Sequence, residues 1–163
     1  MEIQFSTAGD KHRIVEIYNQ AVAEGLRCAD TVPVTLEEKT GWLELHSNDH
    51  YPIFVARKDG LVVGWCSLSP YRQGRKALFR VAEISYYIDA AHRRCGIGSR
   101  LIEHALENAA DLGLSFFLAI LLDLNHDSIR LLERHGFKKW GHLPEIADFG
   151  HTVCGQVIYG RKV

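Results

Sequence analysis

Hydrophobic and polar residues follow different periods in the middle of the chain. Residues 81–88 alternate at every second position, which is the period of a β-strand. Residues 97–112 repeat apolar side chains every three or four positions, which is typical of an amphipathic helix, and Gly113 is a suitable terminator. Residues 114–122 are almost continuously apolar, as in a strand that is covered on both faces. Because strand–helix–strand units cross over with a right hand, we predict a parallel pair of strands at about 78–88 and 114–122.

Similar patterns predict further elements on either side of this unit. Helix starts are expected at three residues that suit an N-cap: Asp10, Thr35 and Asn125. The helix that starts at Thr35 should end near His46 and bury Leu36, Trp42 and Leu45. The helix that starts at Asn125 should end at Gly136. Short apolar segments predict strands at 3–6, 53–57, 61–69, 137–141 and 153–160, with a loop at 144–150. Because the chain has no internal repeat or linker, residues 1–163 should form a single α/β domain.

Composition argues against several classes of protein. Hydrophobic residues make up 47% of the chain, so a packed globule is expected. A formal net charge of −1 gives no support for nucleic-acid binding. The longest apolar run, Phe116–Leu122, is too short for a membrane span, and the start at Met1 is unlike a signal peptide. Four scattered cysteines favour free thiols in a reducing cytoplasm. His46 and His50 have no third ligand placed beside them, so no metal is expected.

The turn that joins strand 81–88 to helix 97–112 carries the most distinctive chemistry. It reads Arg93-Arg94-Cys95-Gly96-Ile97-Gly98-Ser99. Glycines let the backbone approach a ligand closely, and the first N–H groups of a helix point outward at its positive end, so this combination favours phosphate. The Gly-x-Gly-x-x-Gly dinucleotide pattern and the Gly-x-x-x-x-Gly-Lys-Ser/Thr P-loop are both absent. An ordinary strand-to-helix turn with glycines is the alternative.

Two motifs and their order resemble the GNAT N-acetyltransferases. The first is Arg-x-x-Gly-x-Gly from Arg93 to Gly98, which resembles the pyrophosphate loop of that family. The second runs from Asn125 to Gly136-Phe137 and resembles the family's segment with Asn at its start and Gly-Phe at its end. The chain is most similar to the phosphinothricin acetyltransferase-like group. Marks of that group are Ile17-Tyr18-Asn19, residues 33–38, Trp42, residues 51–56, Pro70-Tyr71-Arg72 and Glu83-x-Ser85-x-Tyr87-Ile88.

This resemblance implies a GNAT fold with a mixed central sheet flanked by helices, and acetyl-CoA as the cosubstrate. Backbone groups of Tyr86–Ile88 would pair with the pantetheine arm like an added strand. N–H groups of Arg94–Ser99 would hold the pyrophosphate, and Asn125 would hydrogen-bond the cofactor arm. The implied cofactor-binding residues are therefore Tyr86, Tyr87, Ile88, Arg93, Arg94, Cys95, Gly96, Ile97, Gly98, Ser99 and Asn125. Members of the family acylate a primary amine by direct attack on the thioester, which implies acetyl transfer to a small amino-acid-like amine.

The polar face of strand 81–88 suggests where the amine is bound. Val81, Glu83, Ser85 and Tyr87 share this face. By the resemblance, Glu83 is the candidate catalytic base that takes the ammonium proton, directly or through water; a solvated carboxylate on the sheet is the alternative. Ser85 on this face is a candidate substrate-binding residue. Arg72 and Arg75 are further candidates, because arginine suits a substrate carboxylate; the alternative is that the two arginines are solubilising loop charges.

Position 132 departs from the family pattern. Many members carry a tyrosine there that can protonate the leaving thiolate, whereas this chain has Leu132. The proton donor is therefore unassigned, and Tyr86, Tyr87 or Tyr159 would have to reach the thiolate from elsewhere in the chain.

Other questions of function and assembly stay open at this point. A peptide or protein amine acetyltransferase and a non-catalytic acyl-CoA-binding module are the alternatives to an enzyme that acts on small amines. The two C-terminal strands, with Trp140 and residues 157–159, should leave apolar surface uncovered. Together with the resemblance, this surface favours a two-fold homodimer.

Overall fold

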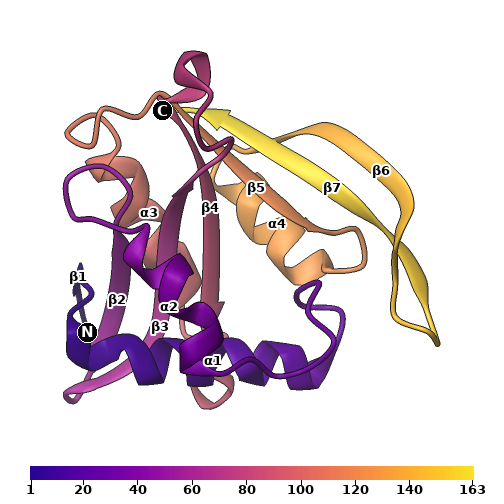
Figure 1. The fold of residues 1–163 in the computed structure, drawn as a ribbon, viewed down its shortest axis with the longest axis horizontal. Helices are drawn as coiled ribbons and strands as arrows, with labels where there is room; N and C mark the ends of the chain where they lie inside the picture. The colour runs from indigo at the N-terminus through magenta and orange to yellow at the C-terminus, as the bar shows by residue number, and fades with distance from the viewer.

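The computed structural model describes all residues from Met1 to Val163 and contains one seven-stranded sheet, with the order β1-β2-β3-β4-β5-β7-β6 (Figure 1). The strands are β1 (Glu2–Phe5), β2 (Ile53–Lys58), β3 (Leu61–Pro70), β4 (Val81–Ile88), β5 (Phe116–Leu122), β6 (Lys138–Asp148) and β7 (Val153–Lys162). The helices are α1 (Lys11–Glu24), α2 (Leu36–Glu44), α3 (Ile97–Asn108) and α4 (His126–Arg134). None of these helices combines the length and the apolar composition that a membrane crossing requires.

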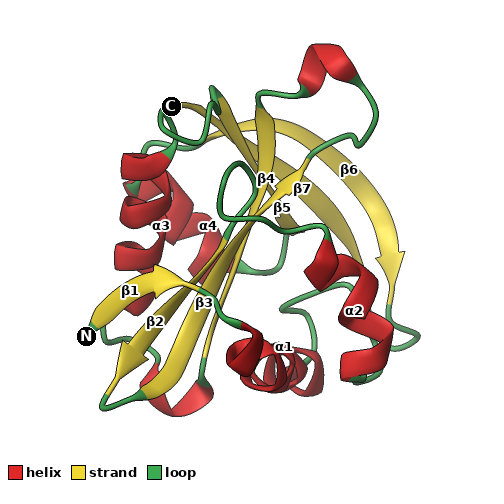
Figure 2. Cartoon of the chain, turned by 60° about the vertical axis from the view of Figure 1, so that its left-hand side comes forward, coloured by secondary structure: helices red, strands yellow, loops and turns green.

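Helices cover both faces of the sheet (Figure 2). α3 and α4 pack on one face, over a core that includes Leu101, Ile102 and Phe117. α1 and α2 pack on the other face, where Ile17 and Trp65 belong to a smaller core. The β6–β7 hairpin extends beyond these helices at one side of the molecule (Figure 1). The prediction of an α/β fold with a mixed sheet between helices is therefore confirmed.

The predicted parallel pair is the only parallel contact in the sheet, and it is short. β4 pairs with β5 at three positions, Val81 with Phe116, Ala82 with Phe117, and Glu83 with Leu118. Every other neighbouring pair of strands is antiparallel. Beyond Glu83 and Leu118 the two parallel strands no longer pair with each other, although each still pairs with its outer neighbour. A gap therefore opens in the middle of a continuous sheet.

Side-chain hydrogen bonds are found at the predicted starts of α1 and α2, and in each helix one detail differs from the prediction. The Thr35 side chain accepts from the Glu38 N–H at 3.2 Å, and the Glu38 carboxylate accepts from the Thr35 N–H at 2.7 Å, which is the predicted capping box. In this helix Leu43 is buried, whereas the predicted Leu45 is 48% exposed. Asp10 precedes α1 but makes no side-chain cap bond to it. Its carboxylate instead accepts from Thr7 and from Arg57, so Asp10 ties the helix start to β2.

Two predicted boundaries were wrong. β4 begins at Val81 rather than near Leu78, because residues 76–78 form a 3₁₀ turn in which the Leu78 N–H donates to the Arg75 carbonyl at 2.8 Å. The predicted loop at 144–150 lies mostly within β6, which continues to Asp148. An irregularity around Glu145, whose φ is 53°, absorbs the extra residues and lets the strand continue.

Candidate active site

The separation of β4 from β5 opens a cleft of about 810 Å³. Residues from β4, β5, α4 and the loop before α3 line it, and about half of them are hydrophobic. Ten of the eleven predicted cofactor residues lie in this lining: Tyr86, Tyr87, Ile88, Arg93, Arg94, Gly96, Ile97, Gly98, Ser99 and Asn125. Ser85 lines it as well. The structure thus brings together residues that are far apart in the sequence.

The N-terminus of α3 faces this cleft. Gly96 precedes the helix with a φ of 76°, a left-handed conformation that glycine adopts without a steric cost. The first bond that enters the helix runs from the Arg100 N–H to the Gly96 carbonyl at 3.1 Å, so the N–H groups of residues 97–99 come before it and have no helical partner. With the positive end of the helix dipole, these N–H groups form a site suited to phosphate.

The cations around this end of the cleft differ in their availability. Arg93 lies 2.5 Å from the Glu24 carboxylate, so its charge is already paired. Arg94 and Arg134, which both line the cleft, make no ion pair within 4.0 Å. Cys95 is exposed and does not line the cleft. Arg94 and Arg134 are therefore better placed than Arg93 to meet an anionic ligand.

Asn125 is buried, 6% exposed, in the lining of the cleft, where it precedes α4. Its Oδ1 accepts from the Ser128 N–H at 3.4 Å, which caps α4, and also from the Arg27 guanidinium at 3.4 Å. Its amide nitrogen donates to the Arg27 carbonyl at 3.5 Å. Asn125 therefore fixes the segment between α1 and α2 against α4, in addition to lining the cleft.

Sequence reasoning missed part of the basic lining. Arg27, Arg130 and Arg134 also line the cleft, and Arg27 and Arg130 share Asp127 as an ion-pair partner. The four-residue spacing of Arg130 and Arg134 places both on one face of α4, and this spacing was the available signal. Arg27 lies in a loop, where sequence periodicity does not indicate which way a side chain points.

Glu83 does not itself line the cleft; it precedes Ile84, which does, and occupies the last position where β4 pairs with β5. Its side chain is half-buried, it makes no hydrogen bond or ion pair in the structure, and burial raises its pKa. Tyr87 shares its face and packs between Tyr18 and Trp65, with ring centroids 5.0 and 4.8 Å away. A carboxylate with a raised pKa beside an aromatic wall can accept a proton from a bound ammonium.

The predicted arginines for a substrate carboxylate lie elsewhere in this chain. Arg72 and Arg75 are exposed in the segment between β3 and β4, and neither lines the cleft. Their role in substrate binding stays a prediction. Ser67 on β3 is opposite Ser85 in the register, and its hydroxyl is buried without a partner.

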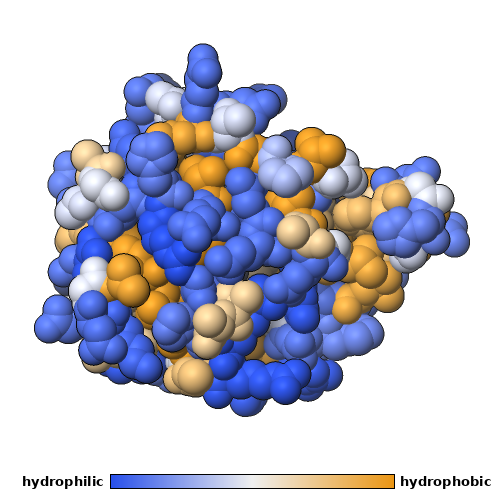
Figure 3. All heavy atoms as spheres, turned by 90° about the horizontal axis from the view of Figure 1, so that it is seen from below, coloured by the Kyte–Doolittle hydropathy of each residue, from blue (hydrophilic) through white to orange (hydrophobic).

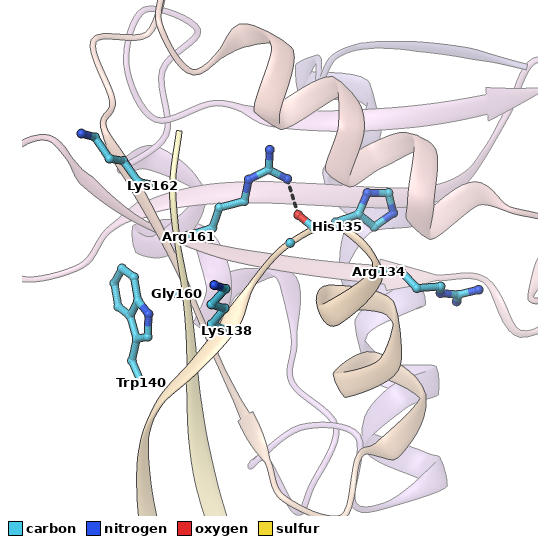
Figure 4. Close-up of a pocket in the computed structure, with 8 residues that line it drawn as sticks. Arg134, His135, Lys138, Trp140, Gly160, Arg161 and Lys162 are labelled. Carbon is cyan, nitrogen blue, oxygen red and sulfur yellow. Dashed lines mark hydrogen bonds between the residues drawn. The ribbon is translucent and has the colours of Figure 1, made fainter.

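A second hollow of about 580 Å³ lies at the C-terminal end of α4 (Figure 4). Arg134, Lys138, Arg161 and Lys162 line it together with His135 and Trp140. Arg161 donates to the His135 carbonyl and so satisfies the end of α4, where cations also meet the negative end of the helix dipole (Figure 4). This contact gives Arg161 a structural role at the end of α4.

Comparisons with known proteins agree with this geometry. The sequence matches the model of the acetyltransferase (GNAT) family over residues 13–137. YwnH of Bacillus subtilis, a provisionally named phosphinothricin acetyltransferase, is 36% identical over 164 residues, which cover 100% of this chain and 99% of YwnH. The phosphinothricin N-acetyltransferase of Streptomyces viridochromogenes is 31% identical over 162 residues, 99% of this chain and 87% of that protein. The structure of yncA from Salmonella typhimurium, solved with acetyl-CoA, has a TM-score of 0.91 and 25% identity, and the match covers 99% of this chain and 93% of yncA.

Proposed function

Because the chain belongs to the GNAT acetyltransferase family, we propose that it transfers the acetyl group of acetyl-CoA to the primary amine of a small amino-acid-like molecule. The observation that carries this proposal is the cleft between β4 and β5, whose lining includes the N-terminus of α3 and Ile84, the residue next to Glu83. The relatives named for phosphinothricin acetylation support the substrate class, since their names specify a small amino-acid-like acceptor.

The chain's own groups suit two parts of the cosubstrate, the pyrophosphate and the amide-bearing arm. The N–H groups of residues 97–99 would hold the pyrophosphate, with Arg94 and Arg134 supplying positive charge. The edge of β4 from Tyr86 to Ile88 would pair with the amide-bearing arm, because this edge has no strand partner in the cleft. Asn125 would border the arm on the opposite side. These roles remain our proposal for each residue.

Glu83 is proposed as the base. An alkylamine has a pKa of about 10.4 and is mostly protonated at neutral pH, whereas attack on a thioester needs the neutral amine. A half-buried carboxylate with a raised pKa would take this proton directly or through water, and the nitrogen would then attack the carbonyl carbon.

A homodimer is the assembly that we propose. The apolar surface differs from the one predicted, because Val157 and Tyr159 are buried, 2% and 5% exposed. Trp140 is exposed as predicted, and the other large exposed apolar side chains on the projecting hairpin are Leu143, Ile146 and Val153. Apolar residues are visible among hydrophilic ones at that side of the molecule in Figure 3. A second copy of the chain would cover this surface.

Thiol release from acetyl-CoA, measured with a panel of amines, tests the proposed function. The panel contains free amino acids, phosphinothricin and short peptides with a free N-terminus. Turnover with free amino-acid-like amines is the expected result. Turnover with peptides alone would contradict the substrate class. Binding of acetyl-CoA without turnover of any amine would favour the non-catalytic module.

A further inference from the structure

Acetyl transfer leaves a thiolate that must gain a proton, and Leu132 supplies no donor for it. Thiols of this kind have a pKa of about 8.5, so a hydrogen-bond donor at the sulfur eases its departure. Leu132 is buried, 1% exposed, and presents only hydrocarbon to the cleft. A donor has to come from another element that lines the cleft.

Most of the chain's candidate tyrosines are unsuited to this position. Tyr159 does not line the cleft, and its hydroxyl donates to the Glu133 carboxylate at 2.9 Å. Tyr18 donates to Asp30 at 2.5 Å and does not line the cleft either. Tyr87 lines it but faces α1, on the same side of β4 as Glu83. A donor there would lie on the face of the base.

Tyr86 lines the cleft from the opposite face of β4 and points toward α4. Its hydroxyl donates to the Ser128 carbonyl at 3.4 Å, a long bond that leaves the group free to change partner. Ser128 lies one helical turn before Leu132 on α4. Helical side chains lean toward the N-terminus, so a side chain at 132 would carry its end back over the turn that contains Ser128. The Tyr86 hydroxyl therefore occupies the region that a long side chain at position 132 would reach.

We propose that Tyr86 donates a hydrogen bond to the departing sulfur and then gives it a proton. The inference rests on the proposed acetyl transfer. In this step the amine nitrogen forms a bond to the carbonyl carbon, the carbon–sulfur bond breaks, and its electron pair stays on sulfur. Glu83 holds the proton lost by nitrogen, Tyr86 gives its phenolic proton to sulfur, and solvent reprotonates the phenolate.

The surroundings of Tyr86 keep its hydroxyl protonated, so that it can donate a hydrogen bond. Burial raises its pKa, the bond to Ser128 opposes this, and the nearby Cys66 raises it further. Cys66 is Tyr86's register partner on β3 and is fully buried, with its own pKa raised by burial. Both groups are therefore protonated and uncharged at neutral pH, and no charged group competes with the sulfur for the Tyr86 proton.

Tyr86→Phe removes the hydroxyl and keeps the ring. We expect kcat to fall about 10²-fold while KM for acetyl-CoA changes little, which is the loss typical of a missing general acid. Calorimetric binding gives a second readout. The variant should bind coenzyme A about tenfold more weakly at pH 8.5, where the thiolate is populated, and should bind acetyl-CoA as the parent does.

Tyr159→Phe is the matched control, because it also removes a buried hydroxyl that faces α4 but lies outside the cleft. It should leave kcat and both affinities unchanged. A Tyr86→Phe enzyme with near-normal kcat would overturn the proposal, as would equal weakening of coenzyme A and acetyl-CoA, since that result indicates packing. If the parent protein acetylates no amine, the proposed function fails, and the comparison of coenzyme A with acetyl-CoA still decides the role of Tyr86.

Discussion

Replacing Gly98 by alanine places a methyl group in the wall of the cleft. An ideal Cβ at this position lies 3.0 Å from Cδ2 of Leu131 and 4.0 Å from Cγ1 of Ile88. Both neighbours line the cleft, so the methyl group narrows it beside the N–H groups that we assign to the pyrophosphate. The change therefore separates the binding role of the glycine from its role in folding.

The effect of Gly98→Ala on stability should be small. Gly98 is the second residue of α3, and its φ is outside the left-handed region. Alanine is favoured over glycine within a helix by about 1 kcal/mol. Leu131 is half-buried and meets the methyl group with the end of its side chain, so this side chain can move aside. The movement should cost less than the roughly 1–3 kcal/mol that overpacking a closed core costs. The free energy of unfolding should change by no more than about 1 kcal/mol.

The effect of Gly98→Ala on binding should be larger. A hydrogen bond to a charged group contributes about 1.5–3 kcal/mol, so the loss of one amide–phosphate bond weakens coenzyme A binding by about 10- to 100-fold. Calorimetric titration measures this affinity, and thermal unfolding measures the stability. Gly98→Val, with a larger branched side chain, should bind still more weakly.

Gly41→Ala is the matched control for the helix effect. Gly41 is exposed in α2, and its Cβ would meet no heavy atom within 4 Å. This variant should gain up to about 1 kcal/mol of stability and keep its affinity for coenzyme A. A folded Gly98→Ala protein that binds coenzyme A as tightly as the parent would refute the pyrophosphate assignment.

Three further results are expected. Glu83→Gln should lose about 10²–10⁴-fold in kcat at neutral pH and regain rate as the pH approaches the amine pKa of about 10.4, whereas a loss confined to KM would assign Glu83 to substrate binding. Asp89→Asn should lower the free energy of unfolding at pH 7 by about 3 kcal/mol, since it breaks a buried pair with Arg13. Burial raises the pKa of Asp89, but hydrogen bonds from His92, Gln20 and Arg13 outweigh burial and hold it below its usual value. The stability that the Asp89 carboxylate contributes is therefore present above its unfolded pKa of about 3.9 and is lost as the pH falls. Acid titration of the parent and of Asp89→Asn, followed by circular dichroism, measures this loss. Light scattering at micromolar concentration should give twice the mass of one chain, and a monomeric mass would exclude the dimer.

Much of the fold could be predicted because local signals agree with tertiary packing. The capping box at Thr35 and the continuous apolar run of β5 each specify one structure. The errors occurred where tertiary contacts override a local signal. Asp10 suits an N-cap, yet Arg57 of β2 takes its carboxylate. Residues 144–150 contain proline and glycine, which favour a loop, yet pairing with β7 extends the strand to Asp148.

The candidate site was predictable where one short segment supplies the groups, as in the loop before α3. It was less predictable where separate elements meet. The pairing of Arg93 with Glu24 joins residues that are 69 positions apart in the chain, and no periodicity reveals it. The direction in which Tyr86 points depends on the face that β4 turns to α4, so its proximity to Ser128 required the structure.

The geometry of the sheet limits the kind of ligand that suits the cleft. From Ile84 to Ile88, β4 pairs with β3 on one edge, while its other edge faces the gap to β5. Backbone N–H and C=O groups on that edge need partners, because an unpaired buried polar group costs free energy. A purely apolar ligand would fill the cleft but leave these groups without partners. A ligand with an extended, amide-bearing arm would satisfy them, and a phosphate at one end would also meet the N–H groups of α3. The pantetheine arm and pyrophosphate of acetyl-CoA combine these two features, which is why the separation of two strands suits this cosubstrate.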